Sequence, residues 1–528
     1  MLDVLITGGM VVDGRETPSY IADVGIAGHR IEAIGNLSQH KARRVIDASG
    51  LTVAPGFIDT HVHSEGDLLI NPQHACGLRQ GITTELLGID GMSYAPLSNE
   101  NYRIYRRWLK GLLGEPPEDL DMSSVKAFRA NYHEKVSINT AYLVPNGTMR
   151  LEVAGFHDVP LEGDTMKAAK DLVRESMHQG AIGFSTGSSY YPGPWTSTDE
   201  LVELCEVVRD SNGVYMAEPR RANPERAFKG GGVPEVLEIA RRSGVKIHLA
   251  HFRTDPKTAG KVREHMALID EAKSNGVDVT LDIYPYASGS TIPISFLPSE
   301  AQEGGPEAIV KRLKDPKERK KIVDYLENEY YYLRSLEEVV FSYVPKNTHL
   351  EGISLPEYAA SKNASLGEAL CDLLIEEDLG IGYTMPPPTS YGLWQQVSRD
   401  SMKLLARDDY MVCSDITPAG NMPHPRSYGA FPRFLGRLRR KFGGITLEEM
   451  VHRMTSRPAE RFNLTDRGRI EKGYFADITI FDADRVIDTS TYDDPIQYPV
   501  GIPFVLVNGK VAVDHERCTG VMAGQAIP

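Results

Sequence analysis

The sequence predicts an α/β protein built on a (β/α)8 TIM barrel, and three observations lead to this fold class. The middle of the chain alternates short apolar segments with amphipathic helical ones, which is typical of a parallel sheet covered by helices. Both ends of the chain carry β-rich segments instead. The stretch 291–409 separates the last two strand candidates and is too long for a loop. We therefore expect a barrel with a small β-sandwich domain formed by both termini and an inserted subdomain near the barrel mouth.

The two ends of the chain resemble each other in composition. The N-terminal strand candidates, rich in β-branched residues and punctuated by Gly, are 4–9, 21–26 and 30–35. The C-terminal candidates are 476–481 and 503–511, and the second contains Asn508-Gly509, a strong hairpin turn. We expect residues 1–54 and 466–528 to pair into the sandwich around a barrel formed by residues 55–465.

Eight apolar segments are the candidates for the barrel strands. They are 56–63, 83–91, 138–147, 181–190, 213–220, 245–253, 277–286 and 410–420. Apolar residues at helical spacing predict helices over 201–208 and 266–273, between strands. The insertion 291–409 contains a charged helical stretch, 306–333, and a Pro-rich turn at 386–388. Its position before the last strand favours a lid over the barrel mouth.

Composition excludes several classes of partner. The 528 residues carry a net charge of −14, which argues against nucleic acid and anionic membranes because both require a basic surface. No apolar run is long enough to span a bilayer, and the N-terminus lacks the basic region of a signal peptide. The five cysteines are scattered, as expected for reduced thiols in a cytoplasmic protein. A small-molecule substrate remains the expected partner, and the oligomeric state is left open.

Two histidines, His61 and His63, end the first strand candidate. Alternate residues of a strand point to the same face, so both imidazoles project together, as one divalent metal ion requires. The carboxyl end of a barrel strand is where barrel enzymes build their sites. A His-x-His pair alone is weak evidence, and the segments downstream strengthen it.

Polar residues recur at the carboxyl ends of other predicted strands. Asp90 ends the second strand, Glu218 the fifth and Asp415 the eighth, while the sixth ends in His248 and His251. Barrel geometry brings strand ends together around one axis. Each residue alone is more simply a loop cap or a solvated side chain, but the full set indicates a metal centre.

At this point the chain resembles the amidohydrolase superfamily, and within it the N-acyl-D-amino-acid deacylase (D-aminoacylase) family, along nearly its whole length. The matching motifs are PGFIDTHVH at 55–63, GITT at 81–84, GFSTG at 183–187, DIYPY at 282–286, SD at 414–415, HPRSYGAFPR at 424–433 and GYFAD at 473–477. The resemblance implies a (β/α)8 barrel with a sandwich built from both chain ends, in agreement with the pattern above.

The resemblance also implies a metal centre of one or two divalent ions, most often zinc. Carried over, His61, His63 and Asp415 would form one metal position. Asp90 would bridge to a second position, completed by Glu218 and His251. Well-known relatives commonly have Cys at the bridging position and His at the strand-five position.

Carboxylates at these two positions change the character of the site. Asp90 and Glu218 are hard oxygen donors, which make the second metal position less selective for zinc, so Mn²⁺ is an alternative. A further family histidine on strand three is replaced by Asn146. His248 matches no family ligand and is interpreted as structural.

The activity that the resemblance implies is metal-assisted hydrolysis of an amide. The metal lowers the pKa of water, Asp415 accepts the proton as general base, and the same carboxyl group returns it to the leaving amine.

The family holds the amino-acid carboxylate of its substrate with a basic residue after the strand-six His and with Tyr and Ser hydroxyls. The matching residues here are Arg253, Tyr190, Tyr284 and Ser290. Arg253 replaces a common Lys and would grip the carboxylate with two hydrogen bonds.

Two alternatives stay open. The first is another amidohydrolase reaction, such as cleavage of a cyclic amide, a dipeptide or a specialised metabolite, because Asp90, Asn146 and Glu218 depart from the usual motif. The second is a barrel that binds a ligand without catalysis, although the presence of His61 and Asp415 argues against it.

Overall fold

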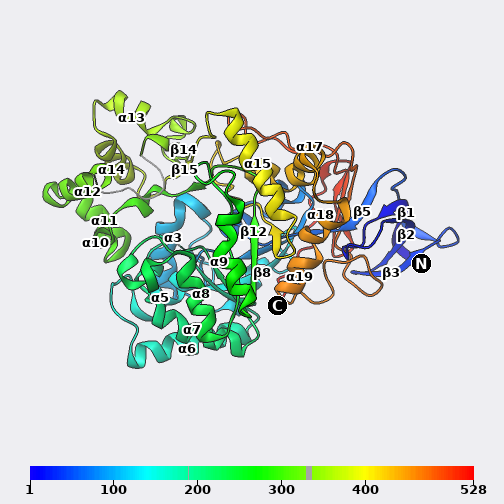
Figure 1. The fold of residues 1–528 in the computed structure, drawn as a ribbon, viewed down its shortest axis with the longest axis horizontal. Coiled ribbons are helices and arrows are strands. Elements are labelled where there is room, and N and C mark those ends of the chain that lie inside the picture. Colours follow the sequence, from blue (N-terminus) through cyan, green and yellow to red (C-terminus); the bar gives the residue numbers. More distant parts are fainter. Residues whose placement is uncertain (188, 329–335) are drawn as a thin grey trace.

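The computed structural model describes residues 1–187, 189–328 and 336–528, and its centre is an eight-stranded parallel sheet (Figure 1). Each of the eight strand candidates overlaps one of these strands, so the predicted barrel is confirmed. The strands are β6 (Phe57–Asp59), β7 (Ile82–Leu87), β8 (Asn139–Pro145), β9 (Gly183–Thr186), β10 (Val214–Ala217), β11 (Lys246–Leu249), β12 (Val279–Ile283) and β16 (Tyr410–Val412). Residue 188 of the fourth candidate and residues 329–333 of the predicted helix 306–333 lie outside the described residues.

The sheet closes toward a barrel just beyond the ends of its first and last strands. The backbone N–H of Asp415 donates to the carbonyl of His61 over 2.8 Å, and that of His63 donates to the carbonyl of Ile416 over 2.9 Å. The carboxylate of Asp59, buried beneath them, accepts from the N–H of Ser414 over 3.0 Å. These bonds fix the segments that carry His61, His63 and Asp415 against one another.

Helices cover the outside of the barrel. The helix α7 (Thr198–Asp210) begins with a capping box, in which Ser197 and Glu200 satisfy each other's backbone N–H groups. Its apolar face is buried, as the helical spacing over 201–208 predicts. The other helices around the barrel are α1 (Glu65–Ile70), α2 (Ala75–Leu78), α3 (Asn99–Leu113), α4 (Val125–Tyr132), α5 (Asn146–Ala154), α6 (Gly163–His178), α8 (Gly232–Ser243), α9 (Val262–Ser274), α15 (Tyr391–Leu405), α16 (Arg426–Pro432), α17 (Arg439–Phe442), α18 (Leu447–Met454) and α19 (Ser456–Arg461).

Both chain ends fold together into one nine-stranded sheet, in which β17 pairs antiparallel with β5. Its core includes Ile6, Val24 and Ile478, all fully buried, and each such side chain contributes about 1.5–3 kcal/mol of hydrophobic stabilisation. Asn508 and Gly509 form the predicted hairpin turn, both with positive φ. The strands are β1 (Leu2–Val11), β2 (Tyr20–Ala27), β3 (Arg30–Gly35), β4 (Ala42–Asp47), β5 (Thr52–Pro55), β17 (Ile478–Phe481), β18 (Phe504–Val507), β19 (Lys510–Asp514) and β20 (Arg517–Cys518).

The segment between β12 and β16 forms a separate three-stranded sheet with its own helices. In Figure 1 these helices lie on the opposite side of the barrel from β1–β3. Its elements are β13 (Ser290–Thr291), β14 (Val340–Tyr343), β15 (Gly382–Thr384), α10 (Ser299–Gln302), α11 (Gly305–Lys314), α12 (Pro316–Asn328), α13 (Leu355–Lys362) and α14 (Leu366–Glu376). Within the described ranges, none of the helices has the length and apolarity needed to cross a bilayer.

Candidate metal centre

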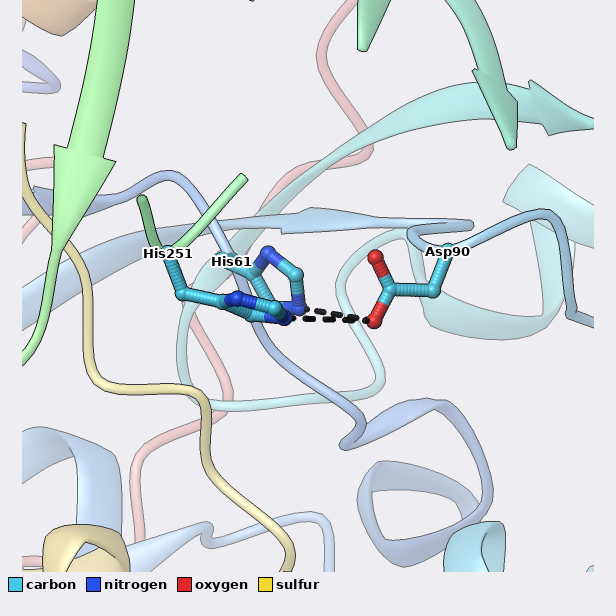
Figure 2. A group of neighbouring side chains, drawn as sticks. All are labelled: His61, Asp90 and His251. Carbon is cyan, nitrogen blue, oxygen red and sulfur yellow. Dashed lines mark hydrogen bonds and ion pairs between the residues drawn. The ribbon is translucent and has the colours of Figure 1, made fainter. Parts of the chain in front are cut away.

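His61 is the central member of a cluster of imidazoles and carboxylates at the carboxyl ends of the barrel strands. It belongs to two groups of potential metal ligands, the first with Asp90 and His251 and the second with His63 and Asp415. In each group the potential ligand atoms lie within 4.8 Å of one another. Figure 2 shows His61 and His251 pointing toward the same carboxylate oxygen of Asp90. The structure therefore brings together residues that the sequence separates by more than 300 positions.

Asp90 connects the two groups through a single oxygen atom. Its Oδ2 lies 3.1 Å from Nε2 of His61, 3.5 Å from Nε2 of His63 and 3.9 Å from Nε2 of His251. The second oxygen, Oδ1, is buried and has no hydrogen-bond partner among the described residues. A carboxylate in this position can bridge two cations, as the resemblance implies for it.

Asp415 approaches the cluster from the end of β16. Its Oδ1 lies 3.4 Å from Nε2 of His63 and 3.8 Å from Nε2 of His61. Its Oδ2 forms an ion pair with Nη1 of Arg426 over 2.7 Å. The two oxygens of one carboxylate thus serve different partners.

Glu218 lies at the edge of the cluster, after β10. Its Oε1 is 4.0 Å from Nε2 of His251, and the side chain is 12% exposed, against 2% for Asp90. This separation is greater than the 3.1 Å between Asp90 and His61. Glu218 lines the cavity described below.

The spacing of these atoms fits a bound cation. Two ligand atoms at about 2.1 Å from one ion, at a tetrahedral angle, are about 3.4 Å apart. The distances of 3.1–3.8 Å within the group of His61, His63, Asp90 and Asp415 fall around this value. The Oδ1 atom of Asp90, which has no hydrogen-bond partner among the described residues, is a further oxygen that could bind a cation. Imidazole nitrogens and carboxylate oxygens are ligands for divalent metals, so the donor set is chemically suited to one.

The charges of the cluster shift the pKa values of its members strongly. Burial alone would lower the pKa of His61, but the carboxylates of Asp90 and Asp415 raise it to about 10. Burial would raise the pKa of Asp415, but Arg426 and His61 hold it below its usual range. Burial likewise opposes ionisation of Asp90, and His61 and His63 overcome it, so the pKa of Asp90 is lowered. In the absence of a metal, the protonated imidazole of His61 therefore keeps the carboxylates of Asp90 and Asp415 ionised.

Arg426 is a member of the site that sequence reasoning did not single out. It belongs to the HPRSYGAFPR motif at 424–433 and is 1% exposed. Besides Asp415, it donates to the carbonyl of Ser290 over 3.1 Å, and its guanidinium lies 4.8 Å from the ring centre of Tyr284. The motif signalled that this Arg matters, but its contact with Asp415 depends on the path of the chain after β16.

A cavity of about 170 Å³ opens beside the cluster, and all four residues predicted to bind a substrate carboxylate line it. Arg253 donates to the hydroxyl of Tyr284 and, over 3.3 Å, to the carbonyl of Ser288. Its Nε is buried without a hydrogen-bond partner in the described part of the chain. The hydroxyl of Tyr190 shares a hydrogen bond with Thr291 over 2.7 Å, and that of Ser290 donates to the carbonyl of Tyr383 over 2.9 Å.

Two other residues considered from the sequence face elsewhere. Both ring nitrogens of His248 are engaged, with the hydroxyl of Thr280 at 2.8 Å and the carboxylate of Asp282 at 2.9 Å. Asn146 donates to the carbonyl of Gly193 over 3.1 Å and does not line the cavity. These contacts agree with a structural role for His248.

Comparison with known proteins places this site in context. A model of the amidohydrolase family matches residues 44–131 and 351–513. The chain is 33% identical to an N-acyl-D-glutamate deacylase of Alcaligenes xylosoxydans xylosoxydans, over 96% of this chain and 93% of the relative. It is 31% identical to a D-aminoacylase of the same organism, over 99% and 97%. The crystal structure of an N-acyl-D-glutamate deacylase from Bordetella bronchiseptica, complexed with zinc and a phosphonate inhibitor, matches with a TM-score of 0.82 and 30% identity, covering 100% of this chain and 99% of that one.

Proposed function

Because the chain belongs to the amidohydrolase family, in its N-acyl-D-amino-acid deacylase branch, we propose that it is a metal-dependent hydrolase that cleaves the amide bond of N-acyl-D-amino acids. One observation carries the proposal: a cluster of five candidate metal ligands, with Glu218 4.0 Å from His251, borders the same cavity as an arginine with an unpartnered buried N–H. The cluster suits hydrolysis, and the arginine suits the carboxylate of an amino acid.

In this proposal His61, His63 and Asp415 would hold one divalent ion, and Asp90, Glu218 and His251 would hold a second. Zinc is the proposed ion, with Mn²⁺ as the alternative because Asp90 and Glu218 are oxygen donors. A divalent ion held here would make water a stronger nucleophile at neutral pH and polarise the substrate carbonyl.

Asp415 is the proposed general base. Its carboxylate takes a proton from the attacking water and passes it to the amine nitrogen as the C–N bond breaks. Arg426 supports this role in two ways, because it fixes the carboxylate through Oδ2 and keeps it ionised before each turnover. The low pKa of Asp415 favours prompt transfer of the proton to the more basic amine.

Arg253 is the proposed anchor of the substrate carboxylate. Its Nε lacks a partner, and the stacking of its guanidinium 4.3 Å from the ring centre of Tyr284 holds it in place. Tyr190 and Tyr284 offer hydroxyls to the same group. Ser290 already donates to a backbone carbonyl, so its hydroxyl must rotate to donate to a ligand.

The insertion 291–409 is proposed to cover the acyl end of the substrate. Phe296, Tyr383 and Met385 of this segment line the cavity and provide apolar surface for an acyl chain. We also propose a cytoplasmic location, which the five unpaired cysteines support.

The test is a substrate panel assayed with the purified protein loaded with Zn²⁺ or Mn²⁺. We expect turnover of N-acetyl-D-amino acids, weaker turnover of the L-enantiomers, and none of hydantoins or cyclic imides. Turnover of the cyclic amides alone would favour the alternative amidohydrolase reaction. Failure to take up metal, with no turnover of any compound, would favour a barrel without catalysis.

A further inference from the structure

Arg221 stands out among the three arginines that line the cavity. Arg426 is committed to Asp415, and Arg253 is held by Tyr284 and Ser288. Arg221, half-buried in the cavity wall, makes no hydrogen bond or ion pair with any residue in the described ranges. A guanidinium without an anion in a cavity of about 170 Å³ can hold a negatively charged group.

Its neighbour in sequence shows what a structural arginine looks like in this loop. Arg220 is 8% exposed and donates from all three nitrogens, to the carboxylate of Glu235 over 2.9 Å and to the carbonyls of Pro194 and Thr196. These bonds tie each of the three guanidinium nitrogens of Arg220 to the scaffold. The scaffold makes no comparable use of Arg221.

The acidic residues of the cavity wall are already engaged. Asp90, Glu218 and Asp415 belong to the proposed metal centre. The carboxylate of Asp255 accepts from the backbone of Lys257 and Thr258, both over 2.8 Å, and from the Thr258 hydroxyl over 2.9 Å. The positive charge of Arg221 is therefore left for a ligand.

The position of Arg221 relative to Arg253 indicates which part of a ligand would carry the negative group bound by Arg221. The strands β10 and β11 are adjacent and parallel, and Ala217 pairs with Leu249 in their register. Arg221 follows Ala217 by four residues, as Arg253 follows Leu249 by four residues. Both cations thus rise from the same side of the barrel mouth, whereas the apolar residues of the cavity come from the insertion.

We propose that Arg221 binds a second carboxylate of the substrate, on the amino-acid half, so that the preferred substrates are N-acyl derivatives of acidic D-amino acids. The inference rests on the proposed function and adds the substrate class to it. Arg253 holds the α-carboxylate, Arg221 holds the side-chain carboxylate, and the acyl chain lies against Phe296 and Met385. Truncating one partner of such a charged hydrogen bond costs about 10- to 100-fold in affinity.

The experiment compares substrates that differ only in charge. The metal-loaded protein is assayed with N-acetyl-D-glutamate against N-acetyl-D-glutamine, and with N-acetyl-D-aspartate against N-acetyl-D-asparagine. We expect kcat/KM to favour the acidic member of at least one pair by about tenfold or more. In Arg221→Gln this preference should fall below about threefold through a higher KM for the acid, with kcat/KM for the amide within about twofold of wild type.

A matched variant controls for loss of positive charge near the loop. Arg226 is ion-paired with Asp158 over 2.6 Å and does not line the cavity, so Arg226→Gln should keep the wild-type preference. Equal kcat/KM for acid and amide in the wild type, or a preference that survives Arg221→Gln, would overturn the inference while leaving the proposed function intact. Turnover of other N-acetyl-D-amino acids but of neither member of any pair would also overturn the inference alone, whereas no turnover of any N-acetyl-D-amino acid would overturn the proposed function itself.

Discussion

The assignment of Asp415 as general base predicts the behaviour of Asp415→Asn. In the wild type, Oδ2 is ion-paired with Arg426 over 2.7 Å while Oδ1 lies 3.4 Å from Nε2 of His63. The amide of Asn has one acceptor oxygen, and Arg426, which only donates, will claim it. The NH2 group then faces the histidines, where it can neither accept a proton nor bind a cation.

The expected loss of kcat in Asp415→Asn follows from the role of the carboxylate as general base. General base catalysis contributes about 10²- to 10⁴-fold, so we expect kcat to fall about 1,000-fold, or about 4 kcal/mol of transition-state stabilisation. Asp90 and the three histidines remain, so the protein should still bind metal when it is supplied in excess. The assay is release of the amino acid from N-acetyl-D-amino acids at saturating metal, together with the metal content per chain.

A control at the other end of the same strand isolates the chemistry. Asp408 precedes β16, and its side chain is 99% exposed, so Asp408→Asn should retain wild-type kcat and metal content. Asp415→Asn with bound metal and a kcat within tenfold of wild type would refute the assignment. Loss of all metal even in excess would show that Asp415 is needed chiefly as a ligand.

Two further predictions concern the metal and the substrate. His61, with a pKa of about 10 in the metal-free cluster, is protonated at pH 7, so metal binding should release at least one proton and tighten as pH rises toward 10. Calorimetry in two buffers of different ionisation enthalpy measures this release, and identical heats in both would contradict it. Arg253→Met should raise KM for N-acyl-D-amino acids about 10- to 100-fold with a smaller change in kcat, measured by steady-state kinetics. An unchanged KM would remove Arg253 from the carboxylate site.

The barrel was predictable because its strands are apolar runs that end in polar residues. The observed β10 lies within the predicted strand 213–220, and the pattern needs only local sequence to be recognised. The same logic located His61, His63 and Asp415 at strand ends. The terminal sheet followed from the composition of the two chain ends and from the Asn508-Gly509 turn.

Other features depend on contacts that no local pattern encodes. The strands β13 and β15 contain two and three residues, too few for an alternation of polar and apolar side chains. Their pairing makes Ser290 donate to the carbonyl of Tyr383, 93 residues away. The contact of Arg426 with Asp415 arises in the same way, from loops that meet only in the fold.

The backbone at three of the proposed ligands adds a physical reason to regard them as a functional set. Asp90, His251 and Asp415 have φ values of 54°, 34° and 56°, in the left-handed region that L-residues seldom adopt. Each such residue costs about 1–3 kcal/mol, and the cost persists only where the surrounding structure enforces it.

Two glycines near Asp90 show how the surrounding structure constrains the backbone there. Gly88 and Gly91 also have positive φ, and a Cβ on Gly88 would lie 2.1 Å from the carbonyl oxygen of Leu143. The chain can therefore make this turn only with glycine at 88, and the turn carries Asp90 to the cluster. The constrained backbone at Asp90, His251 and Asp415 helps to fix their side chains in place before a cation binds. Such pre-organisation is what a catalytic metal centre requires and what a purely structural ion pair does not.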